Sequence, residues 1–262
     1  MRINWRGSIA LLTLWVAVVP VVHGQGLGVA VGVSSDDRWR GLSQSAGDPS
    51  VQVDLHYIRT SWYGGGSAEA VRRPTDRLLG AELIVYGGYE WTWSNQLSAS
   101  LTLRHYDYPQ FSRRYDELAA SMLWGTFLRT TVTGSPDTPA LQYAGPAMQS
   151  SYRYRDPRYS DPGYGDPGYG DPGYRGGRRW AFSYELAARL PLPFGLYAGA
   201  GIGYYDVHRQ AGEGYGYGSI GVGGQWHDWD LDLRYIGTDA RARALFGTAA
   251  SSGLSATVLW NW

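Results

Sequence analysis

Charged side chains in this sequence repeatedly stand two residues apart, with apolar residues between them. Asp230, Asp232 and Arg234 show the pattern, and the positions beside them hold Trp, Leu, Leu and Tyr. Successive side chains of a β-strand point to opposite faces, so this spacing predicts a strand with one charged face and one apolar face. Charged groups gathered on one face could attract ions or bind polar solutes, and they could equally pair with each other.

The same spacing places seven acidic residues, three basic residues and one histidine on the charged faces of predicted strands: Asp54, His56, Glu82, Glu90, Arg104, Glu117, Glu185, Arg189, Asp230, Asp232 and Arg234. Gln52 shares this face, and we expect Arg38 and Arg40 to join it from the first strand. These groups could line a narrow aqueous path or pair into a plug. Because unpaired charges in a confined interior are costly, we expect most of them to pair, while the remaining excess of acids would favour cations.

Residues suited to catalysis are sparse. After residue 24, the histidines are His56 and His105 within predicted strands, His227 in a short turn and His208 in a long connection. The sequence contains no Gly-x-Ser-x-Gly or His-Glu-x-x-His segment, and no pairing of a histidine with a carboxylate emerges from the spacing. It also has no Cys, which excludes disulfides and thiolate metal sites. We therefore expect no enzyme, no cofactor and no metal centre.

Alternation with a period of two recurs from residue 26 to the last residue, and helical periodicity is nearly absent. It predicts twelve strands: Gly26–Leu42, Val51–Arg59, Trp62–Glu69, Leu79–Thr92, Leu97–Tyr106, Tyr115–Trp124, Thr126–Thr133, Trp180–Leu190, Gly195–Tyr205, Tyr215–Trp226, Trp229–Ile236 and Gly253–Trp262. The fold is therefore expected to be all-β. Strand ends inferred from sequence leave room for about ten or fourteen strands.

The connections between these strands alternate in length. Those after even-numbered strands are tight, such as Thr60–Ser61 and His227–Asp228, whereas those after odd-numbered strands are long. A soluble β-sandwich would share the alternation of side chains, but short turns at one end and long loops at the other are typical of transmembrane barrels. We therefore predict a closed antiparallel transmembrane β-barrel, because a closed sheet leaves no strand edge open in lipid.

The last predicted strand places Trp260 and Trp262 on its apolar face. Trp is favoured at the interface between a bilayer and water, so we expect both to join an aromatic girdle. A C-terminal strand ending in an aromatic residue is also the usual signal for the machinery that assembles outer-membrane barrels. We expect that machinery to be a partner during biogenesis.

Two segments stand apart from the predicted strands. Residues 1–24 combine Arg2 and Arg6 with an apolar run, which predicts a signal peptide that is removed and leaves residues 25–262 as the barrel. Residues 135–179 hold a five-residue repeat, Asp-Pro-Gly-Tyr-Gly, that predicts a long disordered outer loop. The alternative is a Tyr- and Arg-rich surface arm that contacts lipopolysaccharide or a partner. Without Arg2 and Arg6, 21 basic residues face 23 acidic ones, and nothing indicates a nucleic-acid partner.

Residues 33–45 (VSSDDRWRGLSQS), followed by Pro49, Val51-Gln52 and Asp54, resemble the opening signature of the Gcw_chp family, also called TorF-like porins. Five later segments resemble later blocks of that family in the same order: GAELIVYGG at 80–88, YDYP at 106–109, YDELA at 115–119, YELAARLPLP at 184–193 and LDLRYIGTD at 231–239. The resemblance covers nearly all of the sequence after residue 24 except the insert. It carries over no catalytic residue.

The resemblance implies a porin in the outer membrane of a Gram-negative bacterium, through whose narrow, charged lumen small solutes or ions diffuse passively. Outer-membrane lipid, lipopolysaccharide and the diffusing solutes or ions are the partners expected of such a barrel. The alternative is a non-conducting structural or adhesive barrel in the same membrane. The solute itself does not follow from the resemblance.

The family motif Arg40, Gly41, Leu42, Ser43 and Gln44 falls where the first predicted strand meets its outer loop. Gly41 would let the backbone bend or be approached closely. Arg40 and Gln44 could hydrogen bond to loop carbonyls or to acids of the barrel wall. The motif is therefore expected to be either a structural clamp at the rim of the barrel or an eyelet that contacts the solute.

Overall fold

The computed structural model describes residues 26–72, 77–111, 113–136 and 180–262. The predicted signal peptide lies outside these ranges, as does the predicted insert from residue 137 onward. Twelve strands close into one sheet: β1 (Gly26–Ser34), β4 (Ser50–Arg59), β5 (Trp62–Arg72), β6 (Leu79–Ser94), β7 (Leu97–Tyr108), β8 (Arg113–Trp124), β9 (Leu128–Ser135), β10 (Ala181–Pro191), β11 (Leu196–Asp206), β12 (Tyr215–Trp226), β13 (Trp229–Thr238) and β14 (Gly253–Asn261).

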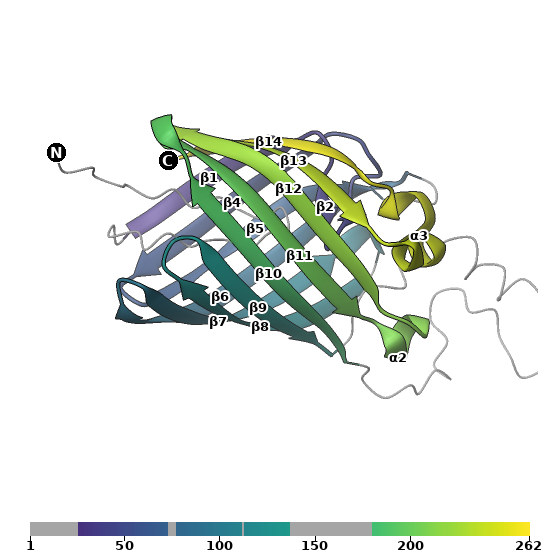
Figure 1. Cartoon of the computed structure of the whole chain (residues 1–262). Coiled ribbons are helices and arrows are strands. Elements are labelled where there is room, and N and C mark those ends of the chain that lie inside the picture. Colours follow the sequence, from purple (N-terminus) through teal and green to yellow (C-terminus); the bar gives the residue numbers. More distant parts are fainter. Residues whose placement is uncertain (1–25, 73–76, 112, 137–179) are drawn as a thin grey trace, which may run out of the picture.

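The sheet is a closed antiparallel barrel, as the sequence predicts (Figure 1). Each strand pairs with its neighbour in sequence order, and closure comes from β1 pairing with β14 between Ala30↔Asn261 and Ser34↔Thr257. The short turns and the chain end marked C lie at one end of the barrel, and the helices α2 (His208–Ala211) and α3 (Ala240–Phe246) lie at the other (Figure 1). Closure satisfies the backbone groups of both edges, which a membrane requires.

The outward face of the barrel is apolar and its inward face is polar. Leu27, Val85, Ile202 and Ile220 are all at least 64% exposed and point outward, whereas the residues beside them in each strand are more covered. A soluble protein rarely exposes apolar surface on this scale. The arrangement therefore suits a barrel surrounded by lipid, and the soluble sandwich is excluded because the sheet closes on itself.

Exposed aromatic side chains gather around the short-turn end. The set consists of Trp62, Trp91, Trp93, Trp124, Phe127, Phe194, Trp226, Trp229, Trp260 and Trp262. Each lies in a short turn, within a few residues of one, or beside Asn261 at the end of β14. Aromatic side chains with one polar edge are stabilised where hydrocarbon meets water, so this ring marks the level of one membrane interface.

The first predicted strand is wrong beyond Ser34. Instead of continuing to Leu42, the chain leaves β1 and forms a small hairpin from β2 (Arg38–Trp39) and β3 (Leu42–Ser43) before it enters β4. Arg40 (φ 50°) and Gly41 (φ 80°) occupy its two-residue turn. A left-handed conformation at both turn residues suits a tight hairpin, and glycine adopts it without steric cost. The alternation of side chains in the sequence therefore continues past the end of β1 into a hairpin that is not part of the barrel wall.

A cap closes part of the long-loop end. Helix α3 and the short helix η4 (Gly247–Ala250) follow β13, and their Phe246 and Ala250 pack in one buried cluster with Leu42 and Tyr215. Asp239 holds this cap in place, because its carboxylate accepts hydrogen bonds from the backbone N–H of Ala242 at 2.9 Å and of Gly216 at 2.8 Å. Among the helices in the described parts of the chain, none has the length and apolar character needed to cross a membrane.

Candidate lumen site

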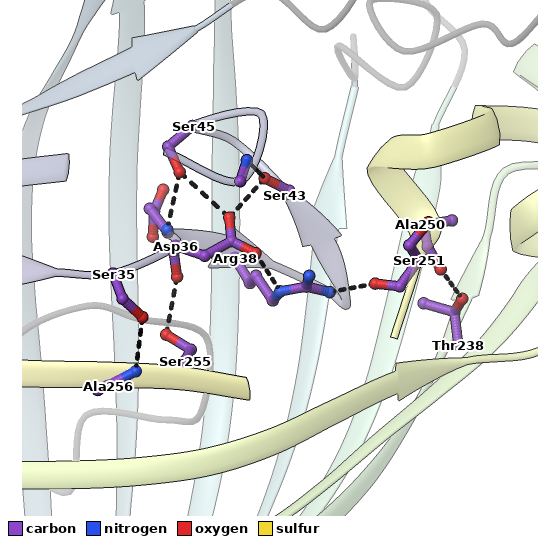
Figure 2. Close-up of polar contacts among 12 residues, drawn as sticks. Ser35, Asp36, Arg38, Ser43, Ser45, Thr238, Ala250, Ser251, Ser255 and Ala256 are labelled. Carbon is purple, nitrogen blue, oxygen red and sulfur yellow. Dashed lines mark hydrogen bonds and ion pairs between the residues drawn. The ribbon is translucent and has the colours of Figure 1, made fainter. Parts of the chain in front are cut away.

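The segment between β1 and β4 is tied together by the carboxylate of Asp36. It accepts hydrogen bonds from Ser43 Oγ at 2.5 Å, Ser45 Oγ at 3.1 Å and Arg38 Nε at 2.6 Å (Figure 2). All four side chains are buried. A buried charge is tolerated only when it is paired and hydrogen bonded, and this set meets both conditions. The segment therefore carries its own polar core.

The same segment is fastened to β14 and to the residues just before it. Arg38 Nη1 donates to the Ser251 carbonyl at 2.5 Å, and Ser255 Oγ donates to the Asp36 carbonyl at 2.7 Å (Figure 2). Ser35 Oγ accepts from the Ala256 N–H at 3.0 Å (Figure 2). These bonds fix the start of the hairpin against one side of the barrel.

The tip of the hairpin reaches the opposite side of the lumen. Arg40 Nη2 lies 2.9 Å from Glu117 Oε1 on β8, and Arg40 Nε lies 4.0 Å from Glu185 Oε1 on β10. Its guanidinium carbon stands 4.0 Å from the centre of the Trp39 ring and 4.4 Å from that of the Tyr205 ring. Burial opposes the charge of Arg40, but Glu117 and its other neighbours raise its pKa well above the ordinary value.

Gly41 fits the hairpin against the barrel wall. A Cβ atom added at this residue would lie 2.6 Å from Cγ2 of Thr238 and 2.9 Å from Cβ of Tyr217. Both distances are shorter than real contacts, so only glycine allows this approach. With anchors on β8, β10, β12, β13 and β14, the hairpin crosses the interior of the barrel. The family motif follows β1 at the long-loop end, and Arg40, Gly41, Leu42, Ser43 and Gln44 are all buried against the inner wall at that end of the barrel.

A group of carboxylates surrounds the other flank of the hairpin. The side chain of Asp37 hydrogen bonds to Glu69 on β5, and it also interacts with Glu82 on β6. Glu69 accepts from Ser50 Oγ at 3.4 Å, and Glu82 accepts from the Tyr108 hydroxyl. Burial, together with the charges of Glu82 and Asp36, raises the pKa of Asp37 well above its ordinary value.

The other predicted charged residues pair mainly along the wall. Asp54 accepts from Tyr86 at 2.8 Å and lies 2.7 Å from Nδ1 of His56. Arg234 Nη2 and the Tyr197 hydroxyl both donate to Oδ2 of Asp232, at 2.9 and 2.7 Å.

Three further predicted residues also lie on the inner wall. Asp230 accepts from Asn261 Nδ2 at 2.9 Å. Arg189 stands over the Tyr197 ring at 3.6 Å. Arg104 faces Glu117 in the register of β7 and β8. Pairing is thus extensive, as expected.

Exposure divides the charged residues into two groups. Asp54 and Glu117 are 2% and 1% exposed, and Glu82 is 8% exposed. By contrast, the side chains of Asp232 and Arg234 keep 20% and 23% of their surface accessible, and Glu90 and Asp230 are also partly exposed. Asp54, Glu82 and Glu117 are closed off, while Glu90, Asp230, Asp232 and Arg234 retain contact with solvent.

The structure places three histidines beside aspartates, a pairing that the spacing in the sequence does not predict. Besides His56, Nδ1 of His105 lies 2.8 Å from Asp116 on the outward face, and Nδ1 of His208 lies 2.6 Å from Asp206. Catalysis by such a pair also needs a nucleophile or an activated water. The Tyr86 hydroxyl joins the His56 pair by donating to Asp54. Within the described residues, no group of three or more His, Asp or Glu side chains is placed to hold a metal ion.

Several interior residues were missed by sequence reasoning. Glu69 and Arg129 lie on the inward face and are 8% exposed, although both stand in predicted strands. Tyr106, Tyr197 and Tyr217 also point inward and donate hydrogen bonds to acids. A tyrosine side chain has an apolar ring and a polar hydroxyl group, so the alternation of apolar and polar residues alone does not show on which face of a strand it lies. Glu69 and Arg129 each stand an odd number of residues from outward-facing residues of their own strand, and this spacing is the signal that could have placed them.

Comparisons with known proteins agree with this architecture. A family described as "Bacterial protein of unknown function (Gcw_chp)" matches residues 23–120. No curated protein sequence matches the chain.

Solved structures with similar folds include the KdgM porin, at 7% identity over 89% of this chain and 98% of that chain, with a TM-score of 0.50. A structure from work on the in-meso crystallization of membrane proteins has 11% identity over 90% of this chain and 83% of that chain, also with a TM-score of 0.50. At these identities the likeness shows a shared barrel fold alone. Residues 23–120 match the model of the Gcw_chp bacterial proteins, so the expected resemblance is confirmed over this part of the chain.

Proposed function

We propose that this protein is an outer-membrane channel in which small solutes or ions diffuse through a narrow, charged lumen that the hairpin restricts. The barrel has an apolar outside, an aromatic ring at one end and a polar inside, which suits a wall between lipid and water. The observation that carries the proposal is the hairpin itself. Its tip is held across the interior by Arg40 and Glu117, as a constriction would be.

Cations are the favoured solutes under this proposal. Among the partly exposed interior groups, Glu90, Glu185, Asp230 and Asp232 are acids, while Arg104, Arg189 and Arg234 are bases. Arg234 is already bonded to Asp232, and Arg189 lies against the Tyr197 ring. Rings of carboxylates concentrate cations locally, so a small excess of acid is enough to bias passage.

A planar-bilayer measurement tests the proposal. Purified protein should give small ohmic steps, and its reversal potential under a salt gradient should show a preference for cations. The double variant Asp230→Asn, Asp232→Asn should lose part of that preference. Asp116→Asn is the matched control, because this carboxylate is exposed on the outward face beside His105 and removing it should leave selectivity unchanged.

A non-conducting structural barrel is the second candidate, and one observation favours it. Arg40, Asp54 and Glu117 are each at most 3% exposed, so the lumen around the hairpin is tightly filled. Under this alternative, folded protein inserts into bilayers and gives no steps, and removal of the hairpin contacts changes stability only. Absence of conductance from a demonstrably folded barrel would therefore select the structural barrel over the channel.

A further inference from the structure

The guanidinium of Arg40 occupies a box of acids and aromatic rings. Glu117 lies 2.9 Å away, Glu185 lies 4.0 Å away, and the rings of Trp39 and Tyr205 stand within 4.4 Å of the guanidinium carbon. Carboxylates that pair with a planar cation between aromatic faces are a general means of recognising guanidinium groups. The box is thus chemically matched to its occupant.

Most of this box belongs to the barrel wall and not to the hairpin. Glu117 is on β8, Glu185 on β10 and Tyr205 on β11. The hydroxyl of Tyr106 donates to Glu117 Oε2 at 3.2 Å, and that of Tyr217 donates to Glu185 Oε1 at 2.6 Å. These bonds orient both acids without help from Arg40. Arg104, which faces Glu117 in the strand register, offsets part of their charge but comes from the wall as well.

Arg40 fills the box imperfectly. Its Nε and Nη1 atoms are buried without hydrogen-bond partners, and Glu117 Oε1 accepts no aligned hydrogen bond despite the 2.9 Å ion pair. The guanidinium of Arg40 is tethered to a tight turn of the hairpin (φ 50°), so its position relative to the two acids depends on that of the hairpin. A free guanidinium group could adopt a two-bond arrangement, because it is not tied to the hairpin.

We propose that the box formed by Glu117, Glu185 and Tyr205 is a binding site for solutes that carry a guanidinium group, and that Arg40 is its built-in occupant. The solute binds when the hairpin tip moves out of the box. Arg40, which is attached to the hairpin, competes with the solute for this site. This assignment rests on the proposed function only in that a solute must reach the lumen. Binding itself can be measured on protein that conducts nothing.

The test uses Arg40→Ala, which empties the box, and guanidinium chloride at low millimolar concentration as the probe. The readout is the unfolding temperature of the full barrel in detergent, followed by its heat-dependent gel migration. Arg40→Ala should unfold at a lower temperature than the wild type, and guanidinium should restore part of the difference. Sodium and tetramethylammonium at equal ionic strength should not. Arg40→Gln, which keeps a shorter, uncharged polar side chain, serves if Arg40→Ala does not fold.

Two controls make the result specific. The double variant Arg40→Ala, Glu117→Gln lacks the main acid of the box and should show no guanidinium response. Arg38→Ala removes another buried arginine, whose acid partner Asp36 belongs to the same segment. Equal protection of Arg38→Ala, of the wild type or of the double variant would overturn the assignment, as would protection by tetramethylammonium or no protection at all. None of these outcomes depends on conductance, so failure here is distinguishable from failure of the channel proposal.

Discussion

Arg40, at the tip of a hairpin inside the barrel, pairs with Glu117 on the wall at 2.9 Å, and both residues are at most 3% exposed. Removing one partner of a buried pair leaves the other charge uncompensated, which costs about 3 to 5 kcal/mol. Glu117→Gln should therefore destabilise the barrel by about this amount, measured by urea unfolding in lipid vesicles.

The matched control replaces both partners. In Arg40→Leu, Glu117→Leu, neither member of the 2.9 Å pair is left without the other, although Glu185 and Arg104 each lose a charged neighbour, so the loss of stability should be smaller than in Glu117→Gln. Equal losses in the two proteins would show that packing around the hairpin, and not the ion pair, holds the tip.

Gly41→Ala should displace the hairpin while the barrel stays folded. The new Cβ would lie 2.6 Å from Thr238 Cγ2, and the positive φ of 80° adds strain. Gly47→Ala is the control, since Gly47 has a similar φ of 78° but nothing within 4 Å of an added Cβ. Single-channel steps should grow in Gly41→Ala and not in Gly47→Ala. Identical steps in both variants would mean that strain alone, without the contact to the wall, accounts for any effect.

The hairpin should loosen as pH rises. The pKa of Asp37 is raised by burial and by Glu82 and Asp36, while its bond to Glu69 and the Arg38 backbone N–H favour the ionised form. A raised pKa in the folded state means that Asp37 contributes stability at pH below its ordinary value of 3.8, and that this contribution is lost as pH rises through the folded-state pKa.

Asp37→Asn removes this contribution together with the effect of the Asp37 charge on its neighbour Glu69. The unfolding temperature of the wild type should fall relative to that of Asp37→Asn as pH is raised from acid to alkaline. A difference that stays constant with pH would contradict a raised pKa of Asp37 in the folded protein.

Trp262→Asp should reduce the amount of folded barrel in the outer membrane far more than Trp262→Tyr. Trp262 is 79% exposed and belongs to the aromatic ring at the short-turn end. Tyr retains a ring with a polar edge that suits the interface, whereas a carboxylate at the lipid boundary is disfavoured. Membrane fractions probed for heat-dependent gel migration give the comparison. Equal levels of the two variants would argue against a lipid-facing role for this residue.

The sequence predicts the wall well because alternation in each strand is a direct record of lipid outside and polar groups inside. Asp230, Asp232 and Arg234 lie on one face, and Leu231 and Leu233 are exposed on the other. The short turns also predict the order of the strands, because two strands joined by only two residues pair as an antiparallel hairpin.

The interior could not be predicted in the same way. Residues 35–42 keep polar and apolar side chains in a strand-like mixture, yet they leave the wall after Ser34. Their path depends on contacts with β8, β10 and β12, which are distant in sequence. The sequence indicates that Gly41 allows a close approach, but it does not show that the approaching residue is Tyr217. Contacts of this kind join residues that are distant in sequence, and they leave no periodic pattern in the sequence.

The most direct test of the account replaces the in-folded segment altogether. Ser34 and Ser50 are partners in the β1–β4 register, so an Asn-Gly turn in place of residues 35–49 can join the two strands without distorting the wall. In planar bilayers, this variant should give steps severalfold larger than the wild type, with the cation preference retained. Steps of equal size in the two folded proteins would contradict a lumen restricted by the hairpin.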